Sequence, residues 1–112
     1  MNVKKFGTKV LIIMTIVLLI TGMGLGAEKG KGKTGREEFQ EKCAICHPEG
    51  GNVIKPDKPL KGSEKLANFQ TFQTWIRNPV PPMTSFPASQ ISERQARVIY
   101  DYILTALKKG WK

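Results

Sequence analysis

The stretch Cys43-Ala44-Ile45-Cys46-His47 (CAICH, residues 43–47) contains both cysteines and the single histidine of a 112-residue chain. A C-x-x-C pair followed directly by histidine is compatible with three kinds of site: a redox dithiol, part of a zinc site, or the attachment point of a c-type haem. Each kind of site needs different surroundings. The rest of the sequence therefore discriminates between them.

Haem attachment is the interpretation that the sequence favours. A dithiol oxidoreductase places its C-x-x-C where a strand meets a helix, and no alternating strand pattern occurs here. A structural zinc site needs four ligands, and the chain offers only Cys43, Cys46 and His47. Two thiols on one side of a helical turn can instead bond a porphyrin edge, and the next imidazole can bind the iron. We expect Cys43 and Cys46 to hold haem covalently, with His47 as the proximal axial ligand.

Met83 is the expected distal ligand of the iron. The one histidine excludes a second imidazole, and the other three methionines lie within the first 23 residues. Met83 lies in the proline-rich stretch PVPPMTSFP, residues 79–87, whose limited backbone freedom can hold a thioether in place. The alternative is a methionine that merely fills a core gap. A core methionine would more often lie on an amphipathic helix, so ligation is favoured.

Residues 1–26 have the pattern of a secretory signal peptide. Three lysines precede the apolar stretch Val10–Ile20, and small residues follow it. This core of 11 residues is shorter than the ~20 that a membrane span needs. We expect cleavage after Gly26 and a periplasmic product. The alternative is an uncleaved anchor that holds the protein on the membrane, facing the periplasm.

The remaining chain is small and basic. Residues 27–33 form a Lys- and Gly-rich linker, and residues 34–112 form one domain. So short a domain has few core side chains, and a covalent apolar cofactor would supply the missing core. Beyond residue 26, fifteen Lys and Arg face nine Asp and Glu. No phosphate-binding or stacking motif supports a nucleic-acid partner, so the charge is expected to favour acidic protein partners.

The domain is expected to be all-α, with about four helices. Two long segments interrupt them: residues 48–62, which contain prolines and glycines, and the proline-rich residues 78–88. The helix before CAICH should continue into the motif, and the one at 72–77 should stop near Asn78 because Pro79 follows. The last should end at Gly110, with Ile91 stapled onto Ala96. The expected N-caps are Thr34, Ser63, Thr71 and Ser92.

Together these residues resemble the class I mono-haem cytochromes c, especially the small cytochrome c6 and c553-like bacterial carriers. The resemblance covers residues 34–107 and rests on CAICH with Gly35 and Phe39 before it, on GGNVIKPDKPLKG (50–62), on Met83 and on ISERQARVIYDYIL (91–104). The stretch RNPVPP (77–82) is similar to cytochrome c6-like proteins of anaerobic metal-reducing bacteria. One departure is Met83-Thr-Ser-Phe86 where the family commonly has Met-Pro-Ala-Phe.

The resemblance implies a cytochrome c fold. In that fold the N- and C-terminal helices cross around one covalent haem, and the small and aromatic residues of the first meet an aromatic of the last, which Tyr102 matches. Residues 52–54 and 58–60 resemble the segment that wraps the haem. Trp111, beyond the Gly110 stop, is expected either to be exposed or to pack on the first helix.

The expected function is one-electron transfer rather than catalysis. An iron bound by His47 and Met83 has no open position for a substrate, so the protein would shuttle electrons between redox partner proteins as a monomer. The alternative is a ligand-binding or sensor haem protein whose sixth ligand is displaceable.

Overall fold

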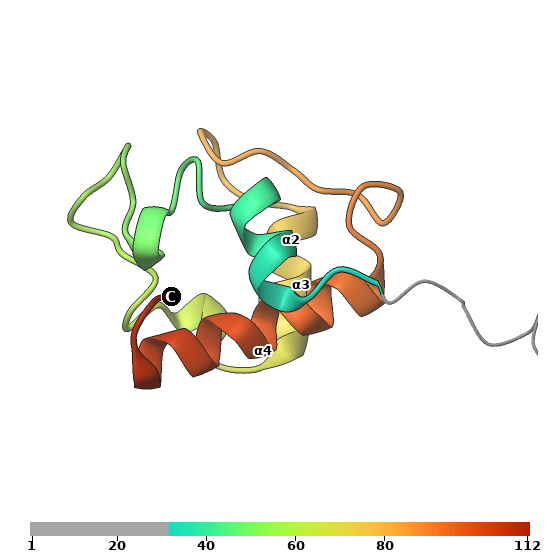
Figure 1. Ribbon diagram of the computed structural model, residues 1–112. Coiled ribbons are helices and arrows are strands. Elements are labelled where there is room, and N and C mark those ends of the chain that lie inside the picture. Colours follow the sequence, from blue (N-terminus) through green and yellow to red (C-terminus); the bar gives the residue numbers. More distant parts are fainter. Residues whose placement is uncertain (1–31) are drawn as a thin grey trace, which may run out of the picture. The chain divides into compact units, whose positions relative to one another are not determined.

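The structure, a computed structural model, describes residues 32–112 (Figure 1). The signal peptide predicted for residues 1–26 and most of the predicted linker lie outside the described residues. Within residues 32–112 the chain is helical, without strands, as the sequence predicted. In this part no helix is long and apolar enough to cross a membrane. The elements are α2 (Gly35–Lys42), η1 (Pro48–Gly50), η2 (Glu64–Leu66), α3 (Phe69–Arg77) and α4 (Glu93–Lys109).

Helix α2 begins as predicted and ends earlier. Thr34 caps it with a complete capping box, in which the Thr34 side chain accepts from the Glu37 N–H and the Glu37 carboxylate accepts from the Thr34 N–H. The helix ends at Lys42, and Cys43 is its C-cap. The prediction that α2 continues into CAICH is therefore wrong, because the motif forms a turn of its own after the helix.

Helix α3 begins three residues before the position predicted from sequence. Its N-cap is Asn68, whose Oδ1 accepts from the Thr71 N–H at 2.9 Å. Asn is as good an N-cap as Thr, so the prediction of Thr71 as the cap was wrong. The helix stops at Asn78, before Pro79, as expected. Ser63 does cap a helical segment, but that segment is the single 3-10 turn η2.

Helix α4 agrees with its sequence signals at both ends. Ser92 and Gln95 form a capping box, and Ile91 and Ala96 on either side of it are buried, as a hydrophobic staple requires. At the other end Gly110 stops the helix with a φ of 93°, a value that favours glycine.

Helices α2 and α4 cross at Gly35 (Figure 1). A Cβ built on Gly35 would lie 1.9 Å from the backbone oxygen of Val98 and 2.9 Å from Cβ of Tyr102, so the two helices approach as closely as a glycine permits. One turn later Phe39 is buried and packs on Tyr102, with ring centroids 5.5 Å apart. The crossing implied by the resemblance is confirmed. The buried core consists of Phe39, Phe72, Ile76, Ile91, Ala96, Ile99, Tyr100 and Ile103.

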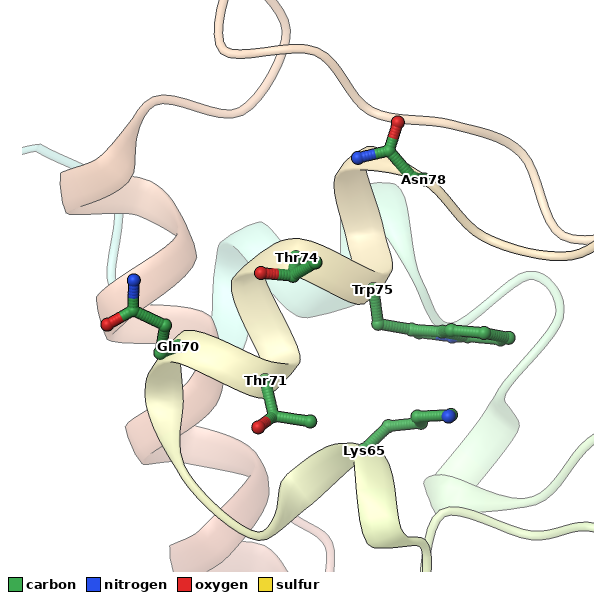
Figure 2. Close-up of a pocket in the computed structure, with 6 residues that line it drawn as sticks. All are labelled: Lys65, Gln70, Thr71, Thr74, Trp75 and Asn78. Atoms are coloured by element: carbon green, nitrogen blue, oxygen red, sulfur yellow. The ribbon is translucent and has the colours of Figure 1, made fainter.

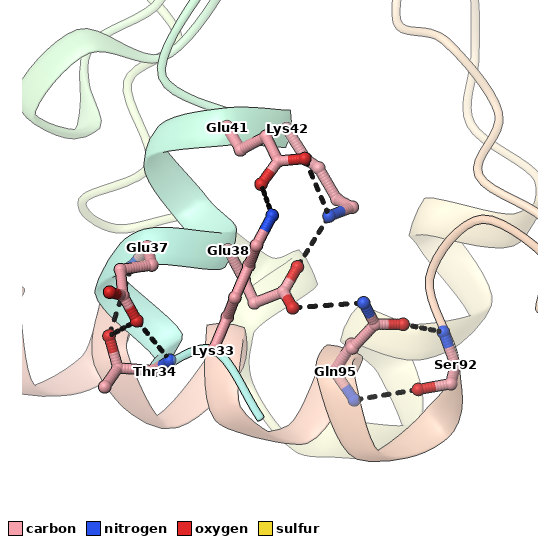
Figure 3. A network of polar contacts seen from close by, with 8 residues as sticks. All are labelled: Lys33, Thr34, Glu37, Glu38, Glu41, Lys42, Ser92 and Gln95. Atoms are coloured by element: carbon pink, nitrogen blue, oxygen red, sulfur yellow. Dashed lines mark hydrogen bonds and ion pairs between the residues drawn. The ribbon is translucent and has the colours of Figure 1, made fainter. Parts of the chain in front are cut away.

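A buried carboxylate joins α2 to the start of α4 (Figure 3). Glu38 is 3% exposed and accepts hydrogen bonds from Lys42 Nζ at 2.6 Å and from Gln95 Nε2 at 3.0 Å. Gln95 in turn accepts from the Ser92 N–H, so the same side chain caps α4 and contacts α2. Burial alone would raise the pKa of the Glu38 carboxyl, but the hydrogen bonds from Lys42 and Gln95 outweigh burial and lower that pKa.

Replacement of this carboxylate, Glu38→Gln, should destabilise the protein at neutral pH. Loss of the charge-assisted bond to Lys42 is expected to reduce the free energy of unfolding by about 1–3 kcal/mol. Because the folded pKa is lowered, the contribution is present above the ordinary pKa near 4.5 and disappears as the pH falls through the folded value. Urea denaturation of both proteins between pH 7 and pH 3 measures this difference.

The matched control is Glu41→Gln on the same helix. Glu41 pairs with Lys33 at the exposed surface, where solvent screens the interaction, so this change should leave stability almost unaffected. Equal stability of the Glu38→Gln variant and the wild type at pH 7 would contradict the role given to the buried carboxylate.

Candidate functional site

The CAICH motif forms a single helical turn directly after α2. The backbone oxygen of Cys43 accepts from the N–H of Cys46 at 3.2 Å and from the N–H of His47 at 2.9 Å. Cys43 itself is fixed to α2, because its N–H donates to the Phe39 oxygen at 2.8 Å. The structure therefore brings three of the four predicted site residues into one turn, anchored on the helix that crosses α4.

Both thiols are free and half-buried. Burial raises the pKa of the Cys43 thiol to about 12, although the charge of Lys42 opposes this shift. A redox-active C-x-x-C has the opposite property, a thiol pKa lowered below its ordinary value. The environment of Cys43 thus disfavours the dithiol interpretation. Within residues 32–112 no group of three or more His, Cys, Asp or Glu side chains is placed to hold a metal ion.

The His47 imidazole is oriented by the loop that follows it. Its Nδ1 lies 2.8 Å from the backbone oxygen of Gly51. A carbonyl oxygen can only accept, so Nδ1 is the donor, and in the neutral imidazole the lone pair is then on Nε2. Metal-binding histidines are typically held in this way, with one ring nitrogen donating to a backbone carbonyl and the other free for the metal.

The segment predicted to wrap the haem folds back onto the motif. The N–H of Val53 donates to the Cys46 oxygen at 3.0 Å, and the N–H of Leu60 donates to the Gly50 oxygen at 2.8 Å. Asn52 closes the loop between these two points: its side chain accepts from two backbone N–H groups and donates to the Lys58 oxygen at 3.1 Å. The loop therefore has a defined shape although it contains no regular secondary structure.

Met83 belongs to the irregular segment between α3 and α4, and Figure 1 shows the course of that segment. It is half-buried and packs against the edge of the core. Its N–H donates to the Val80 oxygen at 3.3 Å, which closes a turn in front of it. The structure thus places the fourth predicted site residue on a different segment from the other three.

Hydrogen bonds to the end of α3 fix the Met83 segment, and no local pattern in the sequence indicates them. Arg77 donates from Nη1 to the Phe86 oxygen at 2.7 Å, and the Phe86 N–H donates to the Ile76 oxygen at 2.8 Å. Ser85 donates from Oγ to the Arg77 oxygen at 2.6 Å. Ser85 stands where the family commonly has alanine, so this departure from the pattern adds a contact that pins the loop.

The residues present fit an apolar prosthetic group. Ile45 is 80% exposed, and Val53, Ile54 and Val80 are each more than half exposed. Ile45 lies in the CAICH turn and Val80 in the Met83 segment, the two segments that carry the predicted site, and Val53 and Ile54 lie in the loop predicted to wrap the haem. Covering these side chains with an apolar group would remove their surface from water, which favours binding of such a group. Two uncommitted thiols and one free imidazole nitrogen complete a donor set suited to covalent haem.

A shallow depression of about 280 Å³ lies between η2 and α3 (Figure 2). Lys65 on one side and Trp75 on the other face each other, with Nζ 4.6 Å from the ring centroid, a cation–π contact. None of the four predicted site residues lines this depression, which is bordered by Lys65, Gln70, Thr71, Thr74, Trp75 and Asn78.

Comparison with known proteins gives a consistent assignment. Residues 30–103 match the family described as "Cytochrome C oxidase, cbb3-type, subunit III". Cytochrome c6 of Cyanidioschyzon merolae is 33% identical over 81 residues, covering 69% of this chain and 76% of that protein. Cytochrome c6 of Synechococcus sp. is 29% identical over 106 residues, covering 90% of this chain and 93% of that protein.

Solved structures agree. OmcF, the outer membrane cytochrome F of Geobacter sulfurreducens, superposes with a TM-score of 0.58 at 35% identity, covering 63% of this chain and 95% of that one. Its solution structure gives a TM-score of 0.57 at 34% identity, with 64% and 95% covered. The helical fold, the CAICH turn and these relatives lead to one assignment: the chain belongs to the cytochrome c family, as a class I mono-haem protein of the cytochrome c6 type whose cofactor is haem c.

Proposed function

We propose that this cytochrome carries single electrons between redox partners, with haem bonded to Cys43 and Cys46 and its iron bound by His47 and Met83. Bound haem supplies a one-electron exchange between ferric and ferrous iron. The observation that carries the proposal is the hydrogen bond from His47 Nδ1 to the Gly51 oxygen, which leaves Nε2 free within the same turn that holds both thiols.

The proposed ligands would sit on two independently fixed segments. The CAICH turn continues from α2, and the Met83 segment is pinned to α3 through Ser85 and Phe86. Ligands held this way need to move little when the iron changes oxidation state, and that favours fast electron transfer. A thioether on one face raises the reduction potential relative to two imidazoles. With both faces of the iron bound, no position remains for a substrate, so the proposed site supports electron transfer and not catalysis.

Partner docking is proposed to involve the exposed lysines in the segment that follows the CAICH turn. Lys55, Lys58, Lys61 and Lys65 are exposed, and such a group can steer an acidic partner. Lys42 is left out of this group because it is paired with Glu38. Steering of this kind weakens as salt rises, so a rate of electron transfer independent of ionic strength would refute this part of the proposal.

Location follows from the predicted export signal. We propose a monomeric periplasmic carrier, with membrane anchoring through uncleaved residues 1–26 as the alternative. OmcF is named as an outer membrane cytochrome, and that supports a place outside the cytoplasm.

The second candidate function is a ligand-binding or sensor protein, which would apply if Met83 were displaceable from the iron.

Replacement of the proposed distal ligand, Met83→Ala, tests the carrier function. The ferric wild type should show the weak near-infrared charge-transfer band of thioether-ligated haem, and the variant should lack it. Loss of the ligand opens one face of the iron, so the ferrous variant should bind carbon monoxide and the wild type should not. Absorption spectroscopy measures both properties.

The control is Val80→Ala, which shortens another apolar side chain of the same segment. It should keep the band and continue to exclude carbon monoxide. A wild type that lacks the band and binds carbon monoxide readily would replace the carrier function with the sensor alternative.

A further inference from the structure

The three residues after α4, Gly110–Lys112, form a segment that we name the Trp111 latch. Gly110 turns the chain back at a φ of 93°. The Trp111 ring then packs on Phe39, with centroids 5.1 Å apart, and meets Tyr102 edge-on at 5.8 Å. The Tyr102 hydroxyl donates to the backbone oxygen of Lys112 at 3.2 Å. Of the two positions expected for Trp111, packing on the first helix is confirmed. Its ring contacts Phe39 of α2 and Tyr102 of α4.

The Trp111 ring also contacts Gly50, in the loop after CAICH. A Cβ on Gly50 would lie 2.2 Å from Cζ2 of Trp111, so the ring rests directly on the glycine backbone. Gly50 is buried and adopts a φ of 76°, which favours glycine in any case. Figure 1 shows the end of α4 lying beside this green loop. The latch thus spans from the α2–α4 crossing to the loop of the proposed iron ligand.

Two backbone hydrogen bonds hold Gly50, the residue directly before the glycine whose oxygen accepts from His47. Its N–H donates to the His47 oxygen at 3.1 Å, and its own oxygen accepts from Leu60 at 2.8 Å. The next residue, Gly51, provides the carbonyl that accepts from His47 Nδ1. A displacement of Gly50 would therefore move the acceptor that orients the imidazole.

The loop is not closely packed on α4 beside the latch. A groove of about 370 Å³ lies there, bordered by both the loop and the end of the helix. Trp111 is one of the side chains that border it, and its ring is in contact with the Gly50 backbone. The Trp111 indole therefore fills the space between Gly50 and the rings of Phe39 and Tyr102.

We infer that Trp111 is a positioning residue for the haem ligand: by pressing on Gly50, it fixes the Gly51 carbonyl and thereby the orientation and Nδ1 proton of His47. The inference rests on the proposed role of His47 as iron ligand. Partners of a ligating histidine tune the metal through this second nitrogen. Trp111 is expected to act on that hydrogen bond without touching the haem-bonding cysteines.

The test is the exchange of the His47 Nδ1 proton with solvent, followed by proton NMR on the reduced, haem-loaded protein well below its unfolding temperature. In Trp111→Ala the exchange should be at least about tenfold faster, equivalent to weakening the closed state by 1.4 kcal/mol. Trp111→Phe keeps a ring above Gly50 and should restore most of the protection. Phe69→Ala, which removes a ring packed on Tyr100 at 5.8 Å, is the matched control and should leave the exchange unchanged.

The outcomes separate the two levels of the argument. If the reduced wild type shows no haem-shifted Nδ1 proton, His47 is not the ligand and the proposed site fails. If the proton is present and its exchange is the same in wild type and Trp111→Ala, the site stands and the latch inference is overturned. If Phe69→Ala accelerates exchange as much as Trp111→Ala, the effect is one of general stability and the inference is likewise overturned.

Discussion

Combined replacement of the two cysteines, Cys43→Ala with Cys46→Ala, should remove covalent haem and leave a chain without a stable fold. The described domain packs three α-helices around a core of eight buried side chains, while four large apolar side chains in the CAICH turn, the loop after it and the Met83 segment are exposed. A domain this small buries a limited fraction of its surface and depends on a staple. Mass spectrometry of the denatured protein should show the haem mass in wild type alone, and far-ultraviolet circular dichroism should show loss of helix in the variant.

The control for this experiment is Ile45→Ala, which changes the most exposed of those apolar side chains and keeps both thiols. It should retain the haem mass and the helical spectrum. A double-cysteine variant that still carried haem after denaturation would disprove thioether attachment at these positions. A haem-free variant that unfolded cooperatively like the wild type would disprove the structural role of the cofactor.

Local signals in the sequence predicted several helix ends correctly, although α2 ends at Lys42 and does not continue into CAICH as predicted. The capping boxes at Thr34 and Ser92 and the stop at Gly110 depend on residues within four positions of one another, and the structure has all three. The CAICH motif is local, but the choice of haem over a dithiol or a zinc site depended on residues throughout the chain. Where two local signals competed, as with Asn68 and Thr71 at the start of α3, the sequence did not decide between them and the prediction failed.

Contacts between distant segments could not be predicted in the same way. The bond between Glu38 and Gln95 joins residues 57 positions apart, and the contact of Trp111 with Gly50 spans a similar distance along the chain. Such contacts depend on the angle and depth at which α2 crosses α4, and helical periodicity does not specify either. Ser85 shows the same limit at short range: its bond to Arg77 exists only because the Met83 segment folds back on α3.

The second large expected effect is a loss of stability on replacement of Gly35, where α2 and α4 cross. In a helix, Gly→Ala ordinarily stabilises by about 0.5–1 kcal/mol, because alanine has the higher propensity. At Gly35 the sign should reverse, since the new Cβ would lie 1.9 Å from the Val98 oxygen, a backbone atom that cannot move aside alone. We expect Gly35→Ala to destabilise by about 1–3 kcal/mol and Gly35→Val by more, through forced separation of α2 and α4. Guanidinium denaturation of the haem-loaded protein measures both.

Gly62→Ala separates this steric effect from the ordinary cost of replacing a glycine. Gly62 has a φ of 80°, and nothing lies within 4 Å of its Cβ position, so only backbone strain of about 1–2 kcal/mol applies. At Gly62, the change from alanine to valine should add little contact with neighbouring atoms. At Gly35, the clash should instead grow steeply with the size of the side chain. A Gly35→Ala protein as stable as wild type would mean that a Cβ at position 35 does not clash with the Val98 backbone of α4. The support that the crossing gives to the CAICH turn, through Phe39 and Cys43, would then need another source.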